Sequence, residues 1–201
     1  MVEARKLATM DIDYSHRRDL RHEPILIIDP PNPFDRDDGV MVDYDFDRGL
    51  YRSLTVISDV AERVRPGTLA AQEAFERGNS HFFTHDRKVF PMLPTALVNA
   101  CSLVQGKTRP VIYCETFWDM DGNEIDHTIG LGVIESQKTL AYGEMEDKIQ
   151  GQGQSGPIFT GIFCAHFWPG DRPMIQASLI NRTREIWTTF TPRHRNFWCI
   201  T

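Results

Sequence analysis

The stretch FWDMDGNEIDH, residues 117–127, decides how the middle of the chain is interpreted. It places four carboxylates and a histidine around one glycine, which fits either a turn between two strands or a cation site. If Asp121-Gly122 forms a two-residue hairpin turn, opposing residues have numbers that sum to 243. This register pairs Trp118 with Ile125, Thr116 with His127, Cys114 with Ile129, and Ile112 with Leu131. Most of these pairs are apolar and share one face, so we predict a β-hairpin.

Calcium binding is the alternative for this stretch. A calcium loop of the helix–loop–helix type has glycine at its sixth position and glutamate at its twelfth. Gly122 is instead the fourth residue counted from Asp119, and strand-like segments flank the loop. The carboxylates are therefore interpreted as turn and surface groups, namely Asp119, Asp121, Glu124 and Asp126.

A second candidate metal site is the run HFFTHD, which contains His81, His85 and Asp86. Histidines four residues apart share a face on a helix. This run has the composition of a strand, where the same spacing separates two side chains by about 13 Å. We predict no metal here, although the sequence does not decide whether either acidic or histidine-rich segment binds an ion.

Length and charge indicate one domain with an uneven charge distribution. The chain has 201 residues and a formal net charge of −6, which argues against a polyanion binder by net charge. Residues 25–60 are rich in aspartate, whereas residues 157–201 are rich in arginine. This pattern is typical of solvated surface charge, and it also permits head-to-tail attraction between copies.

The cysteines and the N-terminus indicate an intracellular protein. Cys101, Cys114, Cys164 and Cys199 show neither a disulfide framework nor metal-ligand spacing, so a reducing compartment is favoured. The first residues lack the hydrophobic core of a secretion signal, and no apolar run reaches membrane-spanning length. We therefore expect a protein that is not secreted.

Periodicity along the chain predicts an α+β fold. Residues 24–28 and 40–46 resemble strands, the second of them an edge strand, and the run 50–64 has the three- and four-residue spacing of an amphipathic helix. Further helices are expected at 69–77, between Thr68 and Gly78, and at 95–105, after Pro94. A short strand is expected at 80–86, and others at 111–118, 124–135, 158–167, 174–180, 185–190 and 196–200, with a flexible loop at 151–156.

These elements predict an antiparallel β-sheet packed with two or three helices and preceded by an extended polar N-terminal arm. Residues 1–37 are expected to be a flexible arm with a proline-rich segment, and residues 38–201 a single α+β globular domain.

The order of elements resembles a known family. GVMV followed by YRSLTVISDVAERVRPG, then ALVNACSLVQG, RPVIYCETFWDMDGNEID and PIFTGIFCAHF, are similar to the strand, helices and core strands of rhabdovirus matrix proteins of the lyssavirus type. The likeness covers the layout of about residues 38–190. It implies a non-enzymatic viral structural protein that self-associates and links membrane to nucleocapsid.

The resemblance also implies partners and sites. Self-association is expected through the proline-rich segment, at Pro30, Pro31, Pro33 and Phe34. An anionic membrane surface or an acidic partner such as nucleoprotein is expected to contact Arg172, Arg182, Arg184, Arg193 and Arg195. The expected location is the host cytoplasm, at the membrane periphery, and the virion. No cofactor and no catalytic residue is predicted.

Other interpretations remain open. A helix after HFFTHDRKVFPMLP followed by long strands also resembles the hot-dog fold of thioesterases and acyl dehydratases, with His85 or Asp86 as base; helix 95–105 offers only Asn99 as a polar group for chemistry. A β-rich adaptor or capsid-type protein is a third class. RHRNFWCI and REIWTTF could stack on single-stranded nucleic acid, but such aromatic residues are more often core, so nucleic acid is an unlikely partner.

Overall fold

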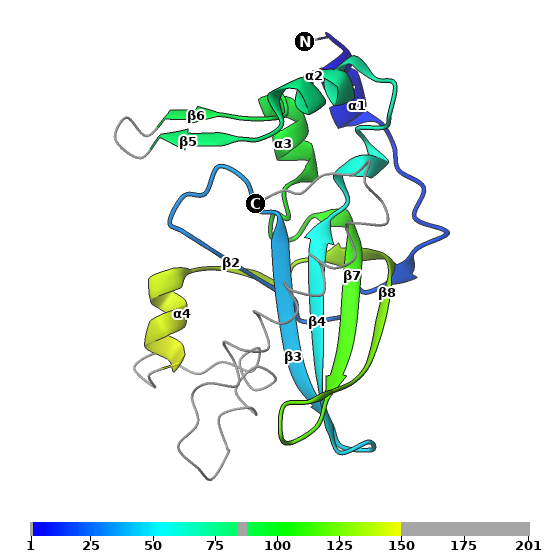
Figure 1. Cartoon of the computed structure of the whole chain (residues 1–201), viewed down its shortest axis with the longest axis vertical. Helices are drawn as coiled ribbons and strands as arrows, with labels where there is room; N and C mark the ends of the chain where they lie inside the picture. Colours follow the sequence, from blue (N-terminus) through cyan, green and yellow to red (C-terminus); the bar gives the residue numbers. More distant parts are fainter. Residues whose placement is uncertain (1, 84–87, 150–201) are drawn as a thin grey trace.

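The computed structural model describes residues 2–83 and 88–149 (Figure 1). In chain order the elements are α1 (Val2–Thr9), β1 (Arg18–Asp19), β2 (Leu26–Asp29), β3 (Asp38–Asp45), β4 (Leu50–Ser58), the 3-10 helix η1 (Val60–Glu62), α2 (Leu69–Arg77), β5 (His81–Phe83), β6 (Lys88–Phe90), α3 (Thr95–Cys101), β7 (Thr108–Trp118), β8 (Glu124–Glu135), β9 (Lys138–Ala141) and α4 (Tyr142–Ile149).

A mixed sheet dominates the described part of the chain. Its strands follow the order β1-β8-β7-β4-β3-β2-β9, and β5 pairs separately with β6. The inner strands are antiparallel, whereas β1 runs parallel to β8 and β2 runs parallel to β9. Helices α1, α2 and α3 gather at one end of the long strands, and the β5–β6 hairpin projects from that end (Figure 1). The fold is thus mixed α/β with few helices, and the expectation of a purely antiparallel sheet is only partly met.

The central hairpin forms in the predicted register. Thr116 pairs with His127, Cys114 with Ile129 and Ile112 with Leu131. The prediction for Trp118 is wrong by one residue, because a β-bulge makes Trp118 pair with Glu124.

The turn of this hairpin is also longer than the predicted two residues. Gly122 has a φ of 80°, and Asn32 is the one non-glycine residue with a positive φ in the described segments, so Asp121 does not adopt the required conformation. The Asp119 carboxylate instead accepts the backbone N–H groups of Asp121 and Asn123, at 2.9 and 2.8 Å. Asp119 therefore acts as a turn residue.

The helix predicted for residues 50–64 is wrong for most of its length. Leu50–Ser58 is strand β4, which pairs with β3 on one side and β7 on the other. Leu54, Val56 and Ser58 alternate along it as buried residues, and β-branched and aromatic side chains favour an extended backbone here. Because β2 and β4 flank β3, the expectation that residues 40–46 form an edge strand is also wrong.

The two shorter helices begin where the sequence predicted. The Thr68 hydroxyl accepts the N–H of Ala71, and Gly78 ends α2 in the left-handed conformation. Pro94 precedes α3, which ends at Cys101 rather than near Gly106. The Glu3 carboxylate also accepts the N–H groups of the first turn of α2, so α1 and α2 are joined at this cap.

The segment expected to be a flexible arm packs against the rest of the chain in the structure. Leu20 and residues 25–27 are fully buried, and β1 and β2 belong to the main sheet. The buried Arg17 guanidinium forms ion pairs with Asp59 and Glu62, each at 2.6 Å. These contacts span more than forty residues of sequence, which local periodicity does not detect.

Two large apolar clusters and a smaller one, of Leu26, Leu140 and Met145, form the core of the described residues. One lies on the sheet and consists of Leu20, Ile25, Ile27, Met41, Leu54, Val56, Leu103, Val111, Tyr113 and Ile134. The other joins the helices and consists of Ala4, Val64, Ala70, Ala74, Met92, Leu93, Leu97 and Val98. The segment between β2 and β3 lies at the junction of the sheet and the helices, and it carries the candidate site.

Several predictions concern residues outside the described part of the chain. These are the strands expected after residue 157, the loop at 151–156, Cys164 and Cys199. Within the described residues, Cys101 and Cys114 are buried free thiols. None of the helices described here has the length and apolar character needed to span a membrane.

Candidate functional site

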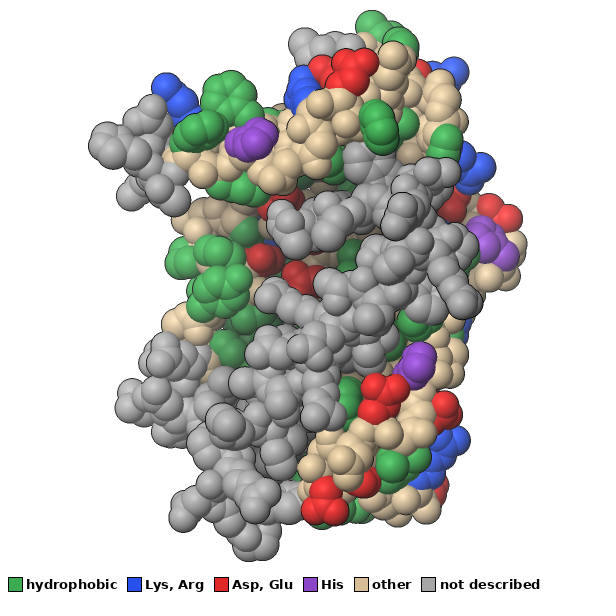
Figure 2. Space-filling view, viewed as in Figure 1, with side chains coloured by type: hydrophobic (Ala, Val, Ile, Leu, Met, Phe, Trp, Pro, Cys, Tyr) green, Lys and Arg blue, Asp and Glu red, His purple; other side chains and the backbone are tan. Residues whose placement is uncertain are grey.

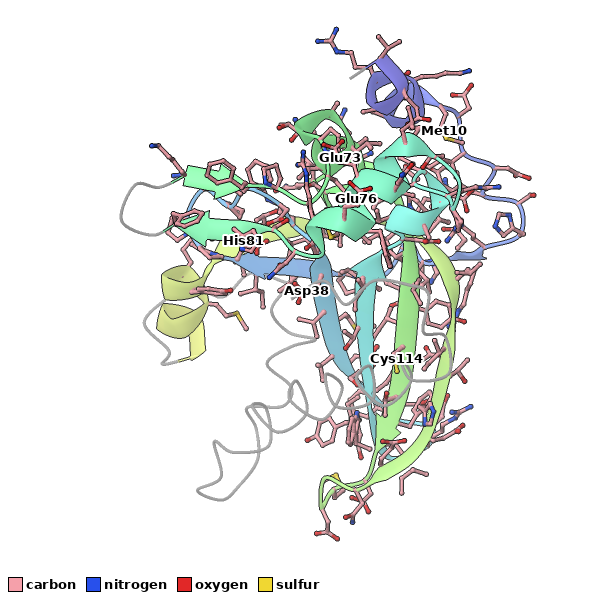
Figure 3. The ribbon with its side chains drawn as sticks, turned by 45° about the horizontal axis from the view of Figure 1, so that its top comes forward. Met10, Asp38, Glu73, Glu76, His81 and Cys114 are labelled. Atoms are coloured by element: carbon pink, nitrogen blue, oxygen red, sulfur yellow. The ribbon has the colours of Figure 1, made fainter. Side chains whose placement is uncertain are left out.

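Four aspartates lie on the segment from the end of β2 to the start of β3, which we name the acidic loop (residues 29–38). Asp29 ends β2, Asp38 begins β3, and Asp35 and Asp37 lie between them. Figure 3 shows Asp38 at the end of β3 that faces the helices. From the sequence, most of this run was assigned to the flexible arm with its proline-rich segment.

Main-chain hydrogen bonds fix the shape of the acidic loop. The N–H of Leu103, just after α3, donates to the Arg36 carbonyl at 2.9 Å. The N–H of Ser58, at the end of β4, donates to the Asp37 carbonyl at 2.7 Å. The Arg36 N–H donates to the Ser102 hydroxyl at 3.4 Å. These bonds anchor the backbone of the acidic loop at Arg36 and Asp37.

The carboxylates are held where their negative charge is unfavourable. Burial, the charges of Asp35 and Asp38, and that of Asp29 raise the pKa of Asp37 to about 7. Burial followed by the charge of Asp38 raises the pKa of Asp29 to about 6, against the opposing effect of Arg36. Burial also raises the pKa of Asp35. Grouped acids with raised pKa values are typical of functional sites.

The acidic loop also contains an unsatisfied acceptor. Asp29 Oδ2 is buried, and no hydrogen-bond donor from the described residues reaches it. A buried oxygen without a donor is costly, and a cation is one way to satisfy it. Carboxylate oxygens are the ligands that Mg²⁺ and Mn²⁺ prefer. In their present positions, no three acidic, histidine or cysteine side chains of the described residues are close enough to hold one metal ion together.

The β5–β6 hairpin carries exposed aromatic side chains. Phe82, Phe83 and Phe90 are 53%, 54% and 60% exposed. The rings of Phe83 and Phe90 meet edge to face with centroids 5.7 Å apart. Figure 2 shows acidic side chains in a hollow below this hairpin. An exposed aromatic pair on a projecting hairpin offers flat surfaces on which nucleic acid bases can stack.

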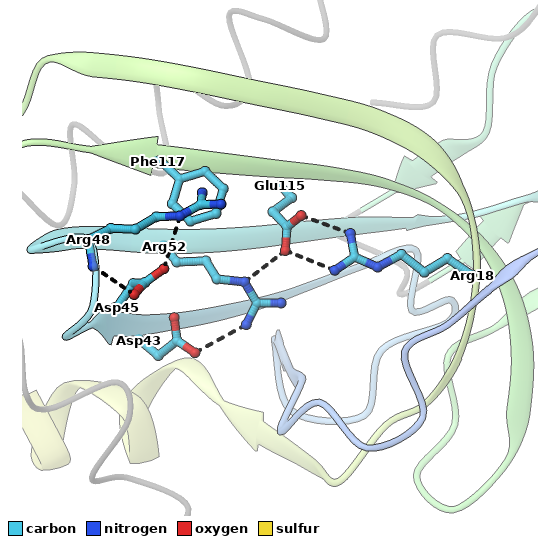
Figure 4. Close-up of a pocket in the computed structure, with 7 residues that line it drawn as sticks. All are labelled: Arg18, Asp43, Asp45, Arg48, Arg52, Glu115 and Phe117. Atoms are coloured by element: carbon cyan, nitrogen blue, oxygen red, sulfur yellow. Dashed lines mark hydrogen bonds and ion pairs between the residues drawn. The ribbon is translucent and has the colours of Figure 1, made fainter.

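A cavity of about 410 Å³ lies elsewhere, on the sheet, and is lined by charged residues (Figure 4). Arg52 donates to Glu23 at 2.6 Å, to Glu115 at 2.7 Å and to Asp43 at 3.1 Å. Burial disfavours ionisation of Glu115, but hydrogen bonds from Arg18 and Arg52 outweigh it and lower its pKa. The arginines here are already paired with carboxylates, so this network joins β1, β3, β4 and β7 and serves the fold.

The residues singled out in the sequence do not form one site. Pro30 and Pro31 are exposed, Pro33 is half-buried, and Phe34 packs against the helical cluster. Their role in self-association stays a prediction. Arg172, Arg182, Arg184, Arg193 and Arg195 lie outside the described residues, as do His85 and Asp86. His81 is exposed on β5.

Solved structures define the class of fold. Residues covering 80% of this chain superpose on 26% of Mycoplasma genitalium RNase R in complex with ribose methylated single-stranded RNA, with a TM-score of 0.73 and 22% identity. Yeast Ssd1, described as a pseudonuclease, superposes over 72% of this chain and 18% of its own, with a TM-score of 0.62 and 17% identity. The described residues therefore have the fold of ribonuclease R-type proteins.

Sequence comparison identifies the family. The RNB domain model matches residues 17–179, so the chain belongs to the RNB domain family. Ribonuclease R of Mycoplasmopsis pulmonis is 37% identical over 137 residues, which are 67% of this chain and 18% of that protein. The chain thus spans less than a third of the length of the curated relatives that it matches.

The family assignment corrects the interpretation of the sequence. The resemblance to rhabdovirus matrix proteins is wrong, and so are the functions inferred from it and the hot-dog and capsid-type alternatives, because the RNB domain match covers most of the chain. The expectation that nucleic acid is an unlikely partner is also wrong for this family, since a related structure contains RNA. Nothing here supports membrane or nucleoprotein partners. The intracellular location stays a prediction.

Proposed function

We propose that this chain binds RNA and hydrolyses its phosphodiester bonds at the acidic loop. The observation that carries the proposal is the group of four aspartates on a loop anchored by main-chain hydrogen bonds, where burial and the neighbouring carboxylates raise the pKa of Asp29 and Asp37. The group lies inside the RNB domain match, and relatives of this chain are named ribonuclease R and DIS3-like exonuclease 2.

Asp29, Asp35, Asp37 and Asp38 would hold divalent cations. The unsatisfied Asp29 Oδ2 and the repulsion among the carboxylates both fit a site completed by positive charge. When bound, such a cation acts as a Lewis acid and makes water a stronger nucleophile at neutral pH. This proposal replaces the expectation that the chain binds no metal.

The chain's own residues position the acidic loop and the RNA. Leu103 and Ser58 hold the acidic loop, and the paired rings of Phe83 and Phe90 offer a stacking surface for bases. In the reaction a water oxygen forms a bond to phosphorus, the bond from phosphorus to one ester oxygen breaks, and the released oxygen takes up a proton. Each stacked base contributes about 1–3 kcal/mol to binding, regardless of its identity.

RNA binding without cleavage is the second candidate. It is favoured by the spacing of the aspartates, since no three side chains of the described set are placed to share one metal ion. It also agrees with the fold shared with yeast Ssd1, which is described as a pseudonuclease.

The two candidates are separated by measuring binding and cleavage on the same labelled single-stranded RNA. Binding is followed by fluorescence anisotropy in EDTA, and cleavage by gel electrophoresis with Mg²⁺ or Mn²⁺. We expect Phe83→Ala/Phe90→Ala to weaken binding about tenfold or more. We expect Asp37→Asn/Asp38→Asn to abolish cleavage while binding persists.

A matched control keeps the test specific. Asp47 is an exposed aspartate beyond the end of β3, and Asp47→Asn should leave both activities unchanged. Binding without metal-dependent cleavage by the unmodified chain would establish the second candidate. Absence of RNA binding would refute both.

A further inference from the structure

Among the residues that the structure describes, strand β8 leaves most of one edge of the main sheet unpaired. Its residues 124–135 pair with β7 along one side, but on the other side β1 covers only Gly132 and Val133 among the described residues. Glu124 to Thr128 are exposed, and Leu131 is 43% exposed. Figure 1 shows this strand at the outer edge of the sheet, below β1. Open edges of this kind pair readily with another strand.

The position of Pro110 shows which backbone groups of β8 face outward, away from β7. Pro110 is opposite Val133, lacks an N–H, and gives its carbonyl to the Asp59 N–H at 3.0 Å on the β4 side. This pair is therefore not hydrogen-bonded, and the Val133 carbonyl points outward, where it accepts the Leu20 N–H at 2.9 Å. By alternation, the N–H and C=O groups of His127, Ile129 and Leu131 also point outward.

We propose that the β8 edge pairs antiparallel with the β8 edge of a second copy of this chain, with Thr128 on the two-fold axis. In this register Ile125 faces Leu131 of the other copy, Asp126 faces Gly130, and His127 faces Ile129. His127 and Ile129 then exchange the outward hydrogen bonds in both directions. The two exposed apolar side chains at the ends of the edge, Ile125 at 56% and Leu131 at 43%, bury each other.

Neighbouring registers are disfavoured by specific contacts. A symmetric antiparallel pair requires a residue to face itself at the axis. With Asp126 at the axis two carboxylates oppose each other, and with His127 two imidazoles do. With Ile129 at the axis, Asp126 of one copy faces Gly132, where Arg18 already occupies the edge. With Thr128 at the axis, the pairing ends at the bulge around Ile125, where the strand bends away before it meets β1.

A cysteine on the axis tests the geometry directly. Opposed residues of a non-hydrogen-bonded antiparallel pair have Cα atoms about 4.5 Å apart, within the range that a disulfide bridges. We expect Thr128→Cys to form an intermolecular disulfide under mild oxidation. Asp126→Cys, also exposed and on the same face, should not, because the two copies of residue 126 would be about 13 Å apart. Peptide mapping by mass spectrometry identifies the linked residues. An equal yield for both variants would overturn the proposal.

Charge variants test the register in the reduced protein by sedimentation velocity. The unmodified chain should dimerise between about 1 and about 500 µM, and Ile125→Lys/Leu131→Lys should weaken the dimer at least about tenfold because like charges face each other. Ile125→Lys/Leu131→Glu should restore it, since each lysine then faces a glutamate. A monomer at every concentration, or failure of the second variant to restore dimerisation, would overturn the proposal. The test is independent of RNA.

Discussion

Replacing Asp37 with asparagine should make the metal-free protein more stable. Asp37 → Asn keeps the shape of the side chain and removes one of the charges that repel each other in the acidic loop. The pKa of Asp37 is raised from 3.8 to about 7, and one pKa unit corresponds to about 1.4 kcal/mol. Solvent screening and the sharing of repulsion with three neighbours reduce the full value, so we expect a gain of about 1–2 kcal/mol near pH 8.

The pH dependence of the free energy of unfolding carries the same information. A carboxyl group with a raised pKa in the folded state binds its proton more tightly there than in the unfolded chain. The metal-free protein should therefore lose stability as the pH rises from about 4 to about 7, through the raised pKa values of Asp29 and Asp37. The slope should be smaller in the Asp37→Asn variant. Urea denaturation at about pH 5 and about pH 8, in EDTA, measures both quantities.

Adding Mg²⁺ or Mn²⁺ should reverse the order of stability. A cation that binds only the folded state stabilises the unmodified protein more than the variant, because the variant has lost a ligand. Asp47→Asn removes the same charge from an exposed turn and should change none of these values by more than about 0.5 kcal/mol. If Asp37→Asn were no more stable than the unmodified chain near pH 8, burial and repulsion in the acidic loop would not be raising the pKa of Asp37.

Three further changes test the packing and polar contacts of the main sheet. Arg52→Met should cost about 2–4 kcal/mol in urea denaturation, because its partners Glu23 and Glu115 stay buried without this cation. A loss under about 0.5 kcal/mol would contradict this. Gly39→Ala should cost about 1–3 kcal/mol by thermal unfolding, since the added Cβ would lie 2.7 Å from Ile27 Cδ1, and an unchanged melting temperature would show that β2 moves aside freely. Trp118→Phe should lower the free energy of unfolding by about 1–2 kcal/mol, because the Trp118 indole donates a buried hydrogen bond to the Ser53 hydroxyl at 2.8 Å. Combining Trp118→Phe with Ser53→Ala should recover part of that loss if the hydrogen bond is responsible.

The sequence predicted those elements whose signals are local. The register of the β7–β8 hairpin follows from alternation on two adjacent strands, and α2 is bounded by Thr68 and Gly78. Strand β4 was mistaken for a helix because its apolar residues happen to recur at three- and four-residue steps. The segment forms a strand because it contains β-branched residues and is buried between neighbouring strands on both sides.

The candidate site was not predicted from the sequence, because its aspartates were interpreted as solvated surface charge and not as a cluster of side chains in one site. Asp29 directly follows the apolar run of β2, and Asp35, Asp37 and Asp38 follow within nine residues, all three in the sequence DRDDG. Placing an acidic side chain next to a buried strand costs free energy. That cost is a better indication of function than the number of acidic residues. That the loop is held by Ser58 and Leu103 could not be predicted, since both are distant in sequence.

The pairing of β2 has a consequence for how the protein is made on the ribosome. β2 is bridged to β3 only at Leu26 and Val40, whereas it pairs with β9 along its whole length, from Leu26 with Lys138 to Asp29 with Ala141. A nascent chain that ends before residue 138 can form the β3–β4–β7–β8 meander, but it has little to position Asp29. The acidic site is thus completed only after synthesis has passed β9. In shorter chains the Asp29 carboxylate is not yet held in place.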